Sequence, residues 1–310
     1  MNKSYNNLWN FINKRFKNKS PSLDSLFVDN KNITDEKAIA DSFNSYFANI
    51  TKSFSVSKNM QSYLNSVHYK NLIKFTSSKL NNSIDFNIPH ITEKSVKDIL
   101  LKITKSNSIG LDSIPPKFIK YVLDPVAPII AKIINIYIDN SYFPSSWKNA
   151  KVIPLHKTGP NNLLNNFRPI SILPCLSKIY ERHIADNLQD YLLCNNLLVP
   201  NQSGFRPLHS CETALLNLIN FYQKCIDSDN MICCILLDFR KAFDIIDHDI
   251  LLTKLKAYNI NGKSYELFKS YLSFRKQSTH FKDTYSSFED IMSGVPQRQH
   301  FRPYSILHLY

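Results

Sequence analysis

Apolar side chains recur at helical spacing in two segments of the N-terminal third of the chain. In the segment 33–50, large apolar residues stand three or four positions apart, which aligns them on one face of a helix. Thr34 comes directly before this pattern and is the expected N-cap. The segment 91–103 repeats the arrangement, with Thr92 as its expected N-cap. The pattern predicts two amphipathic helices.

A different pattern begins near residue 106, where apolar runs alternate with short polar loops. The helices that it predicts span 124–140, 177–194 and 211–227, and the extended segments span 150–157 and 167–173. This mixture of antiparallel-looking strands and packed helices indicates a fold of the α+β class.

The segment MICCILLDF, residues 231–239, is apolar at consecutive positions up to Asp238. An apolar run of this length is typical of a central strand that is covered on both faces. We therefore expect a buried strand here, with Cys233 and Cys234 as buried free thiols. The helix that follows has Asp247 as its expected N-cap.

The composition is strongly basic. Lysine and arginine number 38 against 25 aspartates and glutamates, which gives a formal net charge of +13. This surplus favours a polyanionic partner, because basic surfaces bind phosphate backbones by releasing condensed counterions. A generically basic chain, rich in asparagine and lysine, is the alternative that composition leaves open.

The sequence shows no targeting signal and no cysteine spacing typical of disulfides. Residues 1–20 carry charges throughout and lack the apolar core of a signal peptide, and no apolar run reaches the length of a membrane span. The six cysteines show neither CxxC spacing nor a compact disulfide pattern. We expect an intracellular, reduced protein with no membrane partner and no cysteine metal site; nucleus and cytoplasm stay open.

Asp238 is the first candidate for a functional residue, because it is a carboxylate at the end of a strand that we expect to be buried. Burying a carboxylate is costly unless it is paired or coordinated, so the residue is either part of a metal or substrate site or a structural cap or ion pair. Asp247 and Asp249 belong to the first turn of a helix, where carboxylates cap the backbone and favour the helix dipole. Asp244 could assist the site or orient the chain.

Several blocks of sequence together resemble the reverse transcriptases of non-LTR retrotransposons, in particular the jockey-like and CR1-like branch. The blocks stand in the family's order. They are SNSIGLDSIPPKFIK (106–120), FPSSWKNAKVIPLHKTGPNNLLNNFRPISIL and its continuation (143–184), NQSGFRPLHSCETALLNL (201–218), LLDFRKAFDIIDHDILL (236–252) and SGVPQ (293–297).

This resemblance implies a helix-rich right-hand polymerase fold with fingers and part of the palm. Residues 1–90 are then a helical segment rich in Asn, Lys and Ser that precedes the polymerase, and residues 91–310 are the reverse transcriptase domain. The implied activity is RNA-directed DNA synthesis, with an RNA template, a DNA primer and dNTPs as substrates. Such nucleotidyl transfer uses two Mg²⁺ ions to activate the attacking oxygen and stabilise the leaving one.

The resemblance also assigns roles to individual residues. It makes Asp238 the catalytic metal ligand. The residues implied to bind substrate are Lys157 and Arg168 (triphosphate), Phe239 (through its carbonyl), Phe243 (selection of deoxyribose) and Gln297 (nucleotide and template placement). For Lys157 a solvated basic loop, and for Phe243 simple core packing, are the alternatives.

The sequence departs from the family pattern after Gln297. Arg298 stands where the family has glycine, and no Asp-Asp pair, which carries the remaining catalytic carboxylates in the family, occurs anywhere in the chain. We therefore expect a domain truncated before its catalytic hairpin and thumb, by a reading frame broken inside a polymerase motif, and inactive as a polymerase. The alternatives are a non-catalytic nucleic-acid-binding remnant, or a product that never accumulates.

Overall fold

The fold was analysed in a computed structural model. The residues that it describes are 23–50, 60–80, 85–103, 108–199, 201–204, 206, 208–238, 241 and 243–295. Of the residues singled out above, Phe239, Gln297 and Arg298 lie outside this set.

The described part of the chain consists of helices, a two-stranded sheet (β1 and β2) and a five-stranded sheet. The helices are α2 (Glu36–Ala48), α3 (Met60–Asn65), α4 (Val67–Lys79), α5 (Glu93–Ile103), α6 (Pro116–Tyr121), α7 (Leu123–Asp139), α8 (Ser145–Lys148), the 3₁₀ helix η1 (Leu164–Asn166), α9 (Cys175–Cys194), α10 (Cys211–Asp227), α11 (His248–Ala257) and α12 (Gly262–Leu272). The strands are β1 (Leu26–Val28), β2 (Lys31–Ile33), β3 (Ala150–His156), β4 (Phe167–Ile172), β5 (Arg275–Phe281), β6 (Thr284–Tyr285) and β7 (Glu289–Ile291). No helix among the described residues is long and apolar enough to cross a membrane.

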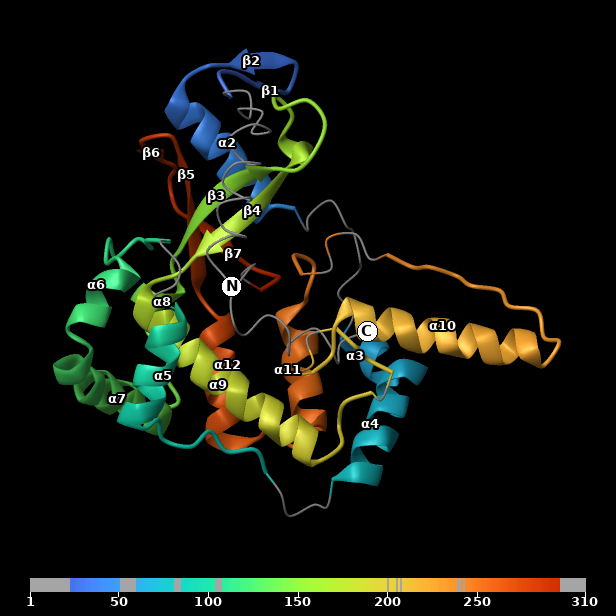
Figure 1. The fold of residues 1–310 in the computed structure, drawn as a ribbon. Helices are drawn as coiled ribbons and strands as arrows, with labels where there is room; N and C mark the ends of the chain where they lie inside the picture. The colour runs from blue at the N-terminus through green and yellow to red at the C-terminus, as the bar shows by residue number, and fades with distance from the viewer. Residues whose placement is uncertain are drawn as a thin grey trace, which may run out of the picture.

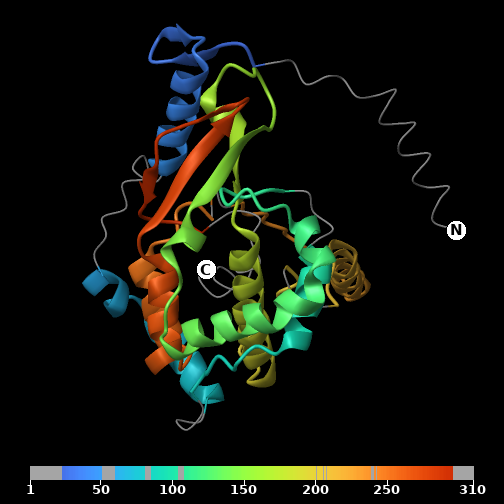
Figure 2. The same cartoon turned by 90° about the vertical axis from the view of Figure 1, so that its left-hand side faces the viewer.

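The central sheet joins two segments that are far apart in sequence. Its order is β4-β3-β5-β6. β6 pairs with the end of β5, and β7 pairs with the start of β5. The β3–β4 pair is antiparallel, whereas β3 and β5 run parallel, with Ala150 opposite Gln277. The sheet forms the upper part of the molecule in Figure 1, and Figure 2 shows its strands from the side, with the main helical layer below.

Helix α2 covers one face of the sheet and builds a separate core there. Phe43 is fully buried and meets the Phe167 ring of β4 edge-on, with 4.8 Å between ring centroids. The residues that share this core are Leu26, Ile39, Ala40, Phe43, Phe47, Ala150, Val152, Leu173 and Phe281. The helical period of the segment 33–50 thus places its apolar stripe against the sheet, as the amphipathic pattern predicts.

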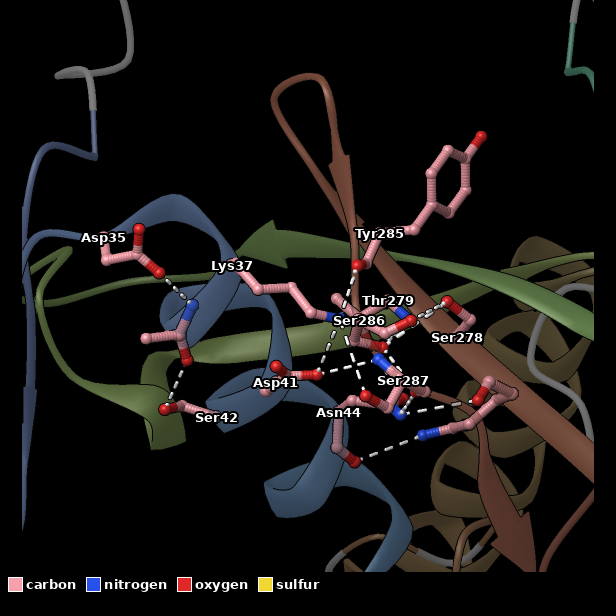
Figure 3. Close-up of polar contacts among 12 residues, drawn as sticks. Asp35, Lys37, Asp41, Ser42, Asn44, Ser278, Thr279, Tyr285, Ser286 and Ser287 are labelled. Atoms are coloured by element: carbon pink, nitrogen blue, oxygen red, sulfur yellow. Dashed lines mark hydrogen bonds and ion pairs between the residues drawn. The ribbon is translucent and has the colours of Figure 1, made fainter.

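Polar contacts also hold α2 to the sheet (Figure 3). The buried Asn44 side chain donates to the Ser287 carbonyl at 2.8 Å, and its Oδ1 accepts from the Thr279 hydroxyl at 3.1 Å. Asp41 accepts from the Ser287 backbone N–H at 2.8 Å. Because buried polar groups are costly without partners, these bonds fix the position of α2 on β5 and the segment that follows it.

The larger core lies among the helices below the sheet. Helix α5 packs against α7 and α9, while α12 contacts α7 and α11. At its centre the rings of Phe143 and Tyr180 stack 5.1 Å apart, and Tyr271 meets Phe143 edge-on. Nonpolar burial of this kind is the main favourable contribution to folding.

The predicted elements of the first three quarters of the chain are largely present. The helices expected at 124–140, 177–194 and 211–227 and the strands expected at 150–157 and 167–173 are all found, with ends shifted by at most two residues. Thr92 caps α5 as expected, since its hydroxyl accepts from the Ser95 N–H at 3.1 Å. Asp35, not Thr34, caps α2, because its carboxylate accepts from the Ala38 N–H at 2.8 Å. Asp247 caps α11 as predicted.

The prediction for residues 231–238 is wrong. We expected a buried central strand, but no strand pairs with this segment among the described residues, and Leu236 is 88% exposed. Cys233 and Cys234 are exposed as well. An apolar run becomes a covered strand only when backbone partners and a facing layer exist, and the described part of the chain supplies neither.

Together with α10 this segment forms an arm, residues 211–238, that projects from the helical layer. Figure 1 shows α10 pointing away from the other helices and the segment after it running back alongside. The Tyr222 hydroxyl of α10 interacts with Cys234 of the returning segment, which raises the pKa of Tyr222. No residue of α10 is buried, although the helix carries the apolar stripe that the sequence predicts.

Candidate nucleotide and nucleic-acid site

The β3–β4 hairpin positions two of the predicted substrate-binding residues. Its register places Leu155 opposite Arg168, and the Lys157 N–H extends the ladder by donating to the Asn166 carbonyl at 2.8 Å. Side chains alternate between the two faces of a strand, so Lys157, Leu155 and Arg168 share one face. Phe167, one position away, points to the opposite face and packs against α2. The hairpin therefore brings the two predicted cations together on the face that α2 leaves open.

The loop between these strands is held by its own hydrogen bonds. The Asn166 side chain donates to the Pro160 carbonyl at 2.8 Å, and a ring nitrogen of His156 lies 2.9 Å from the Gly159 carbonyl. Gly159 has a φ of +81°, and a Cβ there would approach the Asn166 amide nitrogen to 2.9 Å. A glycine is needed at this position for both reasons. Both cations are exposed, so the tip of the hairpin presents positive charge to solvent.

The structure brings two of the sequence blocks into contact at a second place. The Gly294 N–H donates to the Ile246 carbonyl at 2.8 Å, and the Val295 N–H donates to the Phe243 carbonyl at 3.1 Å. A ring nitrogen of His248 lies 2.7 Å from the Gly294 carbonyl. Gly294 has a φ of +76°, and a Cβ would come within 2.6 Å of the Asp244 carbonyl oxygen. The start of SGVPQ therefore docks on the chain that follows Asp238, and only glycine permits the approach.

Phe243 is partly buried and packs against the helical core. This contact is the core-packing role that the sequence left open beside the selection of deoxyribose. The two roles do not exclude one another, because one edge of a half-buried ring can face a ligand.

Asp238 does not lie in the environment that its position in the sequence predicts. Its side chain is exposed, at the end of the unpaired segment of the arm. The described residues contain no group of three or more His, Cys, Asp or Glu side chains that could hold a metal ion. Mg²⁺ is bound by hard oxygen ligands from carboxylates and phosphates. The described residues therefore do not by themselves provide the ligand set of a two-Mg²⁺ centre.

Comparison with known proteins identifies the blocks. Residues 155–297 match the family model described as reverse transcriptase (RNA-dependent DNA polymerase). The chain is 32% identical over 211 residues to the RNA-directed DNA polymerase from the mobile element jockey of Drosophila melanogaster, a match that spans 67% of this chain and 23% of that protein. It is 30% identical over 213 residues to the probable RNA-directed DNA polymerase from transposon BS of the same species, covering 68% of this chain and 23% of that protein.

The chain contains a reverse transcriptase domain of the non-LTR retrotransposon type. The predicted kinship with non-LTR retrotransposon enzymes is thereby confirmed. A further match, 27% identical over 228 residues, is the probable RNA-directed DNA polymerase from transposon X-element of Drosophila melanogaster. The chain spans about a quarter of the length of the relatives that it matches, since these matches cover 23% to 25% of each.

The matched region of this reverse transcriptase contains every residue to which the sequence assigned a role. Lys157 and Arg168 lie together on the hairpin, and Phe243 lies beside Gly294, but Asp238 is on the exposed arm. The structure thus assembles two parts of the candidate site, whereas Asp238 is exposed and belongs to no cluster of metal ligands among the described residues.

A buried set of charged groups in the reverse transcriptase was not predicted. Glu181 of α9 is fully buried; Tyr271 donates to its Oε1 at 3.0 Å, and burial raises the pKa of Glu181 to about 7, against a smaller opposing effect of Arg275. Lys148 and Arg275 are also buried. The helical period of the sequence could have predicted the burial of Glu181, because this residue stands seven positions before the buried Leu188 and so lies on the same face of α9.

Proposed function

We propose that the chain is the fingers and partial palm of a retrotransposon polymerase that synthesises DNA on an RNA template from dNTPs. The observation that carries this proposal is the position of Lys157 and Arg168 on the same open face of the β3–β4 hairpin, within a region that matches the reverse transcriptase family. Residues 91–310 then form the polymerase domain, and residues 1–90 precede it and contribute α2 to the sheet.

The proposed reaction is nucleotidyl transfer. The 3′-hydroxyl of the primer loses its proton to solvent, and its oxygen forms a bond to the α-phosphorus of the dNTP. The bond from this phosphorus to the bridging oxygen breaks, and pyrophosphate leaves with the electron pair. Negative charge on the triphosphate needs cations held in place, which is the role proposed for Lys157 and Arg168. Phe243 is proposed to contact the sugar, and Phe239 and Gln297 to help place the nucleotide.

Mg²⁺ is the proposed cofactor, with Asp238 as one of its ligands. Two ions in such a reaction need more carboxylate oxygens than one residue supplies. The described residues provide no such cluster, and the sequence contains no Asp-Asp pair. We therefore propose that the 310 residues alone do not catalyse polymerisation.

Templated incorporation on a primed RNA tests this proposal. The purified chain is incubated with Mg²⁺ and all four dNTPs, next to Asp238→Ala and Lys157→Ala variants. We expect primer extension no higher than in the Asp238→Ala sample. Extension by the unsubstituted chain that disappears in Asp238→Ala would contradict the proposed inactivity and leave the family activity in place.

A second function, binding of nucleic acid without chemistry, is favoured by the exposure of Lys157 and Arg168 and by the lack of a metal-ligand cluster among the described residues. In this case the exposed cations contact the phosphate backbone. Affinity for a primed RNA would fall steeply with salt, with a slope that decreases by about one for each phosphate contact removed. Binding that is unaffected by Asp238→Ala and by dNTPs, but weakened by Lys157→Ala, would support this function over the first.

A further inference from the structure

A cavity of about 50 Å³ lies on the face of the sheet that α2 covers, close to the docked Gly294. One water molecule needs roughly 10–15 Å³ of a cavity measured in this way, so the space holds about three to five waters, the size of one tetrahedral oxyanion. Pro169 and Ser171 of β4 line the cavity, whereas Arg168 alternates to the other face. The cavity is therefore distinct from the phosphate-facing surface proposed above.

Two buried cations line this cavity. Lys148 is 4% exposed and Arg275 is 2% exposed. The Lys148 ammonium donates to the Ser273 carbonyl at 3.2 Å, and Arg275 Nη1 donates to the Tyr271 carbonyl at 3.1 Å. Arg275 Nη2 is buried and has no hydrogen-bond partner among the described residues. A guanidinium in such a place normally satisfies its donors, because an unpaired buried donor costs free energy.

Two carboxyl groups lie near this positive charge, but neither is at ion-pair distance from the two cations in the described part of the chain. Neither cation forms an ion pair with a carboxylate there, although Asp244 lines the same cavity. Glu181 lies within electrostatic reach of Arg275, but burial raises its pKa to about 7, so its negative charge is incomplete at neutral pH. Burial, and then the charge of Arg275, lower the pKa of Lys148 to about 8. Burying a charge without an ion-pair partner costs free energy. An anion in the cavity would be such a partner for Lys148 and Arg275.

We propose that this cavity binds one small oxyanion of the phosphate class, held by Lys148 and Arg275. Charge-assisted hydrogen bonds from a guanidinium and an ammonium are the usual means of holding phosphate oxygens. The Lys148 ammonium retains donors beyond its bond to Ser273, and Arg275 adds a second positive charge to the cavity lining. The anion is either free phosphate or a phosphate group of a nucleotide or nucleic-acid strand. The site does not depend on the function proposed for Lys157 and Arg168.

Thermal unfolding in inorganic phosphate tests the proposal. The chain is unfolded in increasing phosphate with chloride adjusted to a constant ionic strength, because a ligand that binds only the folded state raises the unfolding temperature in proportion to ln(1 + [L]/Kd). We expect a saturable rise in the unsubstituted chain. Lys148→Met should weaken phosphate binding at least tenfold, whereas Lys148→Arg should retain it.

The matched control is Lys282→Met, which removes an exposed lysine that follows β5 and pairs with Glu36 at the start of α2. Its phosphate affinity should stay within twofold of the unsubstituted chain. If Lys148→Met does not fold, Ser171→Asp serves instead, since a carboxylate at the cavity wall should neutralise the cations and abolish the phosphate effect. No phosphate-specific rise at constant ionic strength, or the same rise in Lys148→Met and Ser171→Asp, would overturn the proposal.

The source of the anion is decided by competition. A short single-stranded RNA that displaces phosphate, with a dependence on Lys148 but not on Lys157, would identify a strand phosphate as the ligand. Displacement by pyrophosphate alone would identify a free anion. Because Lys157→Ala leaves this site intact, failure of the proposed polymerase role and failure of the anion site give different results.

Discussion

Helices α2 and α10 are both amphipathic and both begin with an N-cap, yet they differ completely in burial. Asp35 caps α2, and a reciprocal pair of bonds between Ser210 and Thr213 caps α10. Phe43 of α2 is fully buried against the sheet, whereas Phe221 of α10 is 59% exposed. Local sequence therefore decides that each helix forms, but burial depends on whether another part of the chain offers a complementary surface.

The same difference separates β5 from the segment 231–238. β5 is less apolar in sequence, but it gains strand partners on both edges and hydrogen bonds between Asn44 and its residues Gln277 and Thr279. The segment 231–238 is nearly all apolar and has no strand partner among the described residues. Strand formation is thus set by available partners more than by the apolar content of the strand itself.

The largest expected difference in stability is between α2 and α10 when one aromatic ring is removed from each helix. Phe43→Ala should lower the free energy of unfolding by about 3–5 kcal/mol, because it leaves a cavity between α2 and the sheet. Phe221→Ala should change it by less than about 0.5 kcal/mol, because the ring is already largely in water. Urea unfolding followed by circular dichroism measures both. Equal losses for the two variants would break the comparison.

A pH dependence is expected from Glu181 in the buried region. Its pKa in the folded state, about 7, exceeds its ordinary value of 4.5, so folding favours the protonated form. The resulting stability is fully present below pH 4.5 and is lost as the pH rises through 7. At about 1.4 kcal/mol per pKa unit, the change is of the order of 3 kcal/mol.

Glu181→Gln should remove this part of the pH dependence of the free energy of unfolding, measured by urea titrations between pH 4.5 and 8. Glu266→Gln, at an exposed position of α12, is the matched control and should keep the slope. If the Glu181→Gln and unsubstituted chains show the same slope, the burial of this carboxyl does not govern the dependence.

A smaller loss is expected from the polar contacts between α2 and the sheet. Asn44→Ala leaves the Thr279 hydroxyl and the Ser287 carbonyl without their partner, which should cost about 1–3 kcal/mol. Asn220→Ala, on the exposed helix α10, should cost no more than about 0.5 kcal/mol. Thermal unfolding of the two variants side by side would show whether the network of Figure 3 stabilises the fold as described.

The smallest effect on stability, and the largest on solubility, is expected in the arm. Leu236→Lys should leave the free energy of unfolding within about 0.5 kcal/mol, because the side chain is exposed. It should raise the protein concentration at which aggregation begins, since an exposed apolar segment with unpaired backbone groups is prone to associate. Light scattering against concentration measures this. Unchanged aggregation combined with a large loss of stability would mean that the segment is buried in solution.

Sequence periodicity was sufficient for the helices and the β3–β4 hairpin, because these depend on contacts close in sequence. The parallel pairing of β3 with β5 was not foreseen, since it joins residues more than a hundred positions apart and leaves no local signal. The hairpin register places Lys157 and Arg168 on one face of the sheet, and their role in binding the triphosphate stays a prediction. The strand expected to end at Asp238 was wrong, because a motif records the position of a residue in chain order but not whether its strand finds partners; the role of Asp238 as a metal ligand stays a prediction.

The affinity for a dNTP tests the central functional claim most directly. The unsubstituted chain, Arg168→Gln and the control Lys74→Gln, at an exposed lysine of α4, are compared by titration in the presence of a primed RNA. If the hairpin holds the triphosphate, Arg168→Gln should bind the complementary dNTP about 10- to 100-fold more weakly, the loss expected for one charge-assisted bond, and Lys74→Gln should bind it normally. Equal dNTP affinity in all three proteins would contradict the assignment of this hairpin as the nucleotide-binding surface.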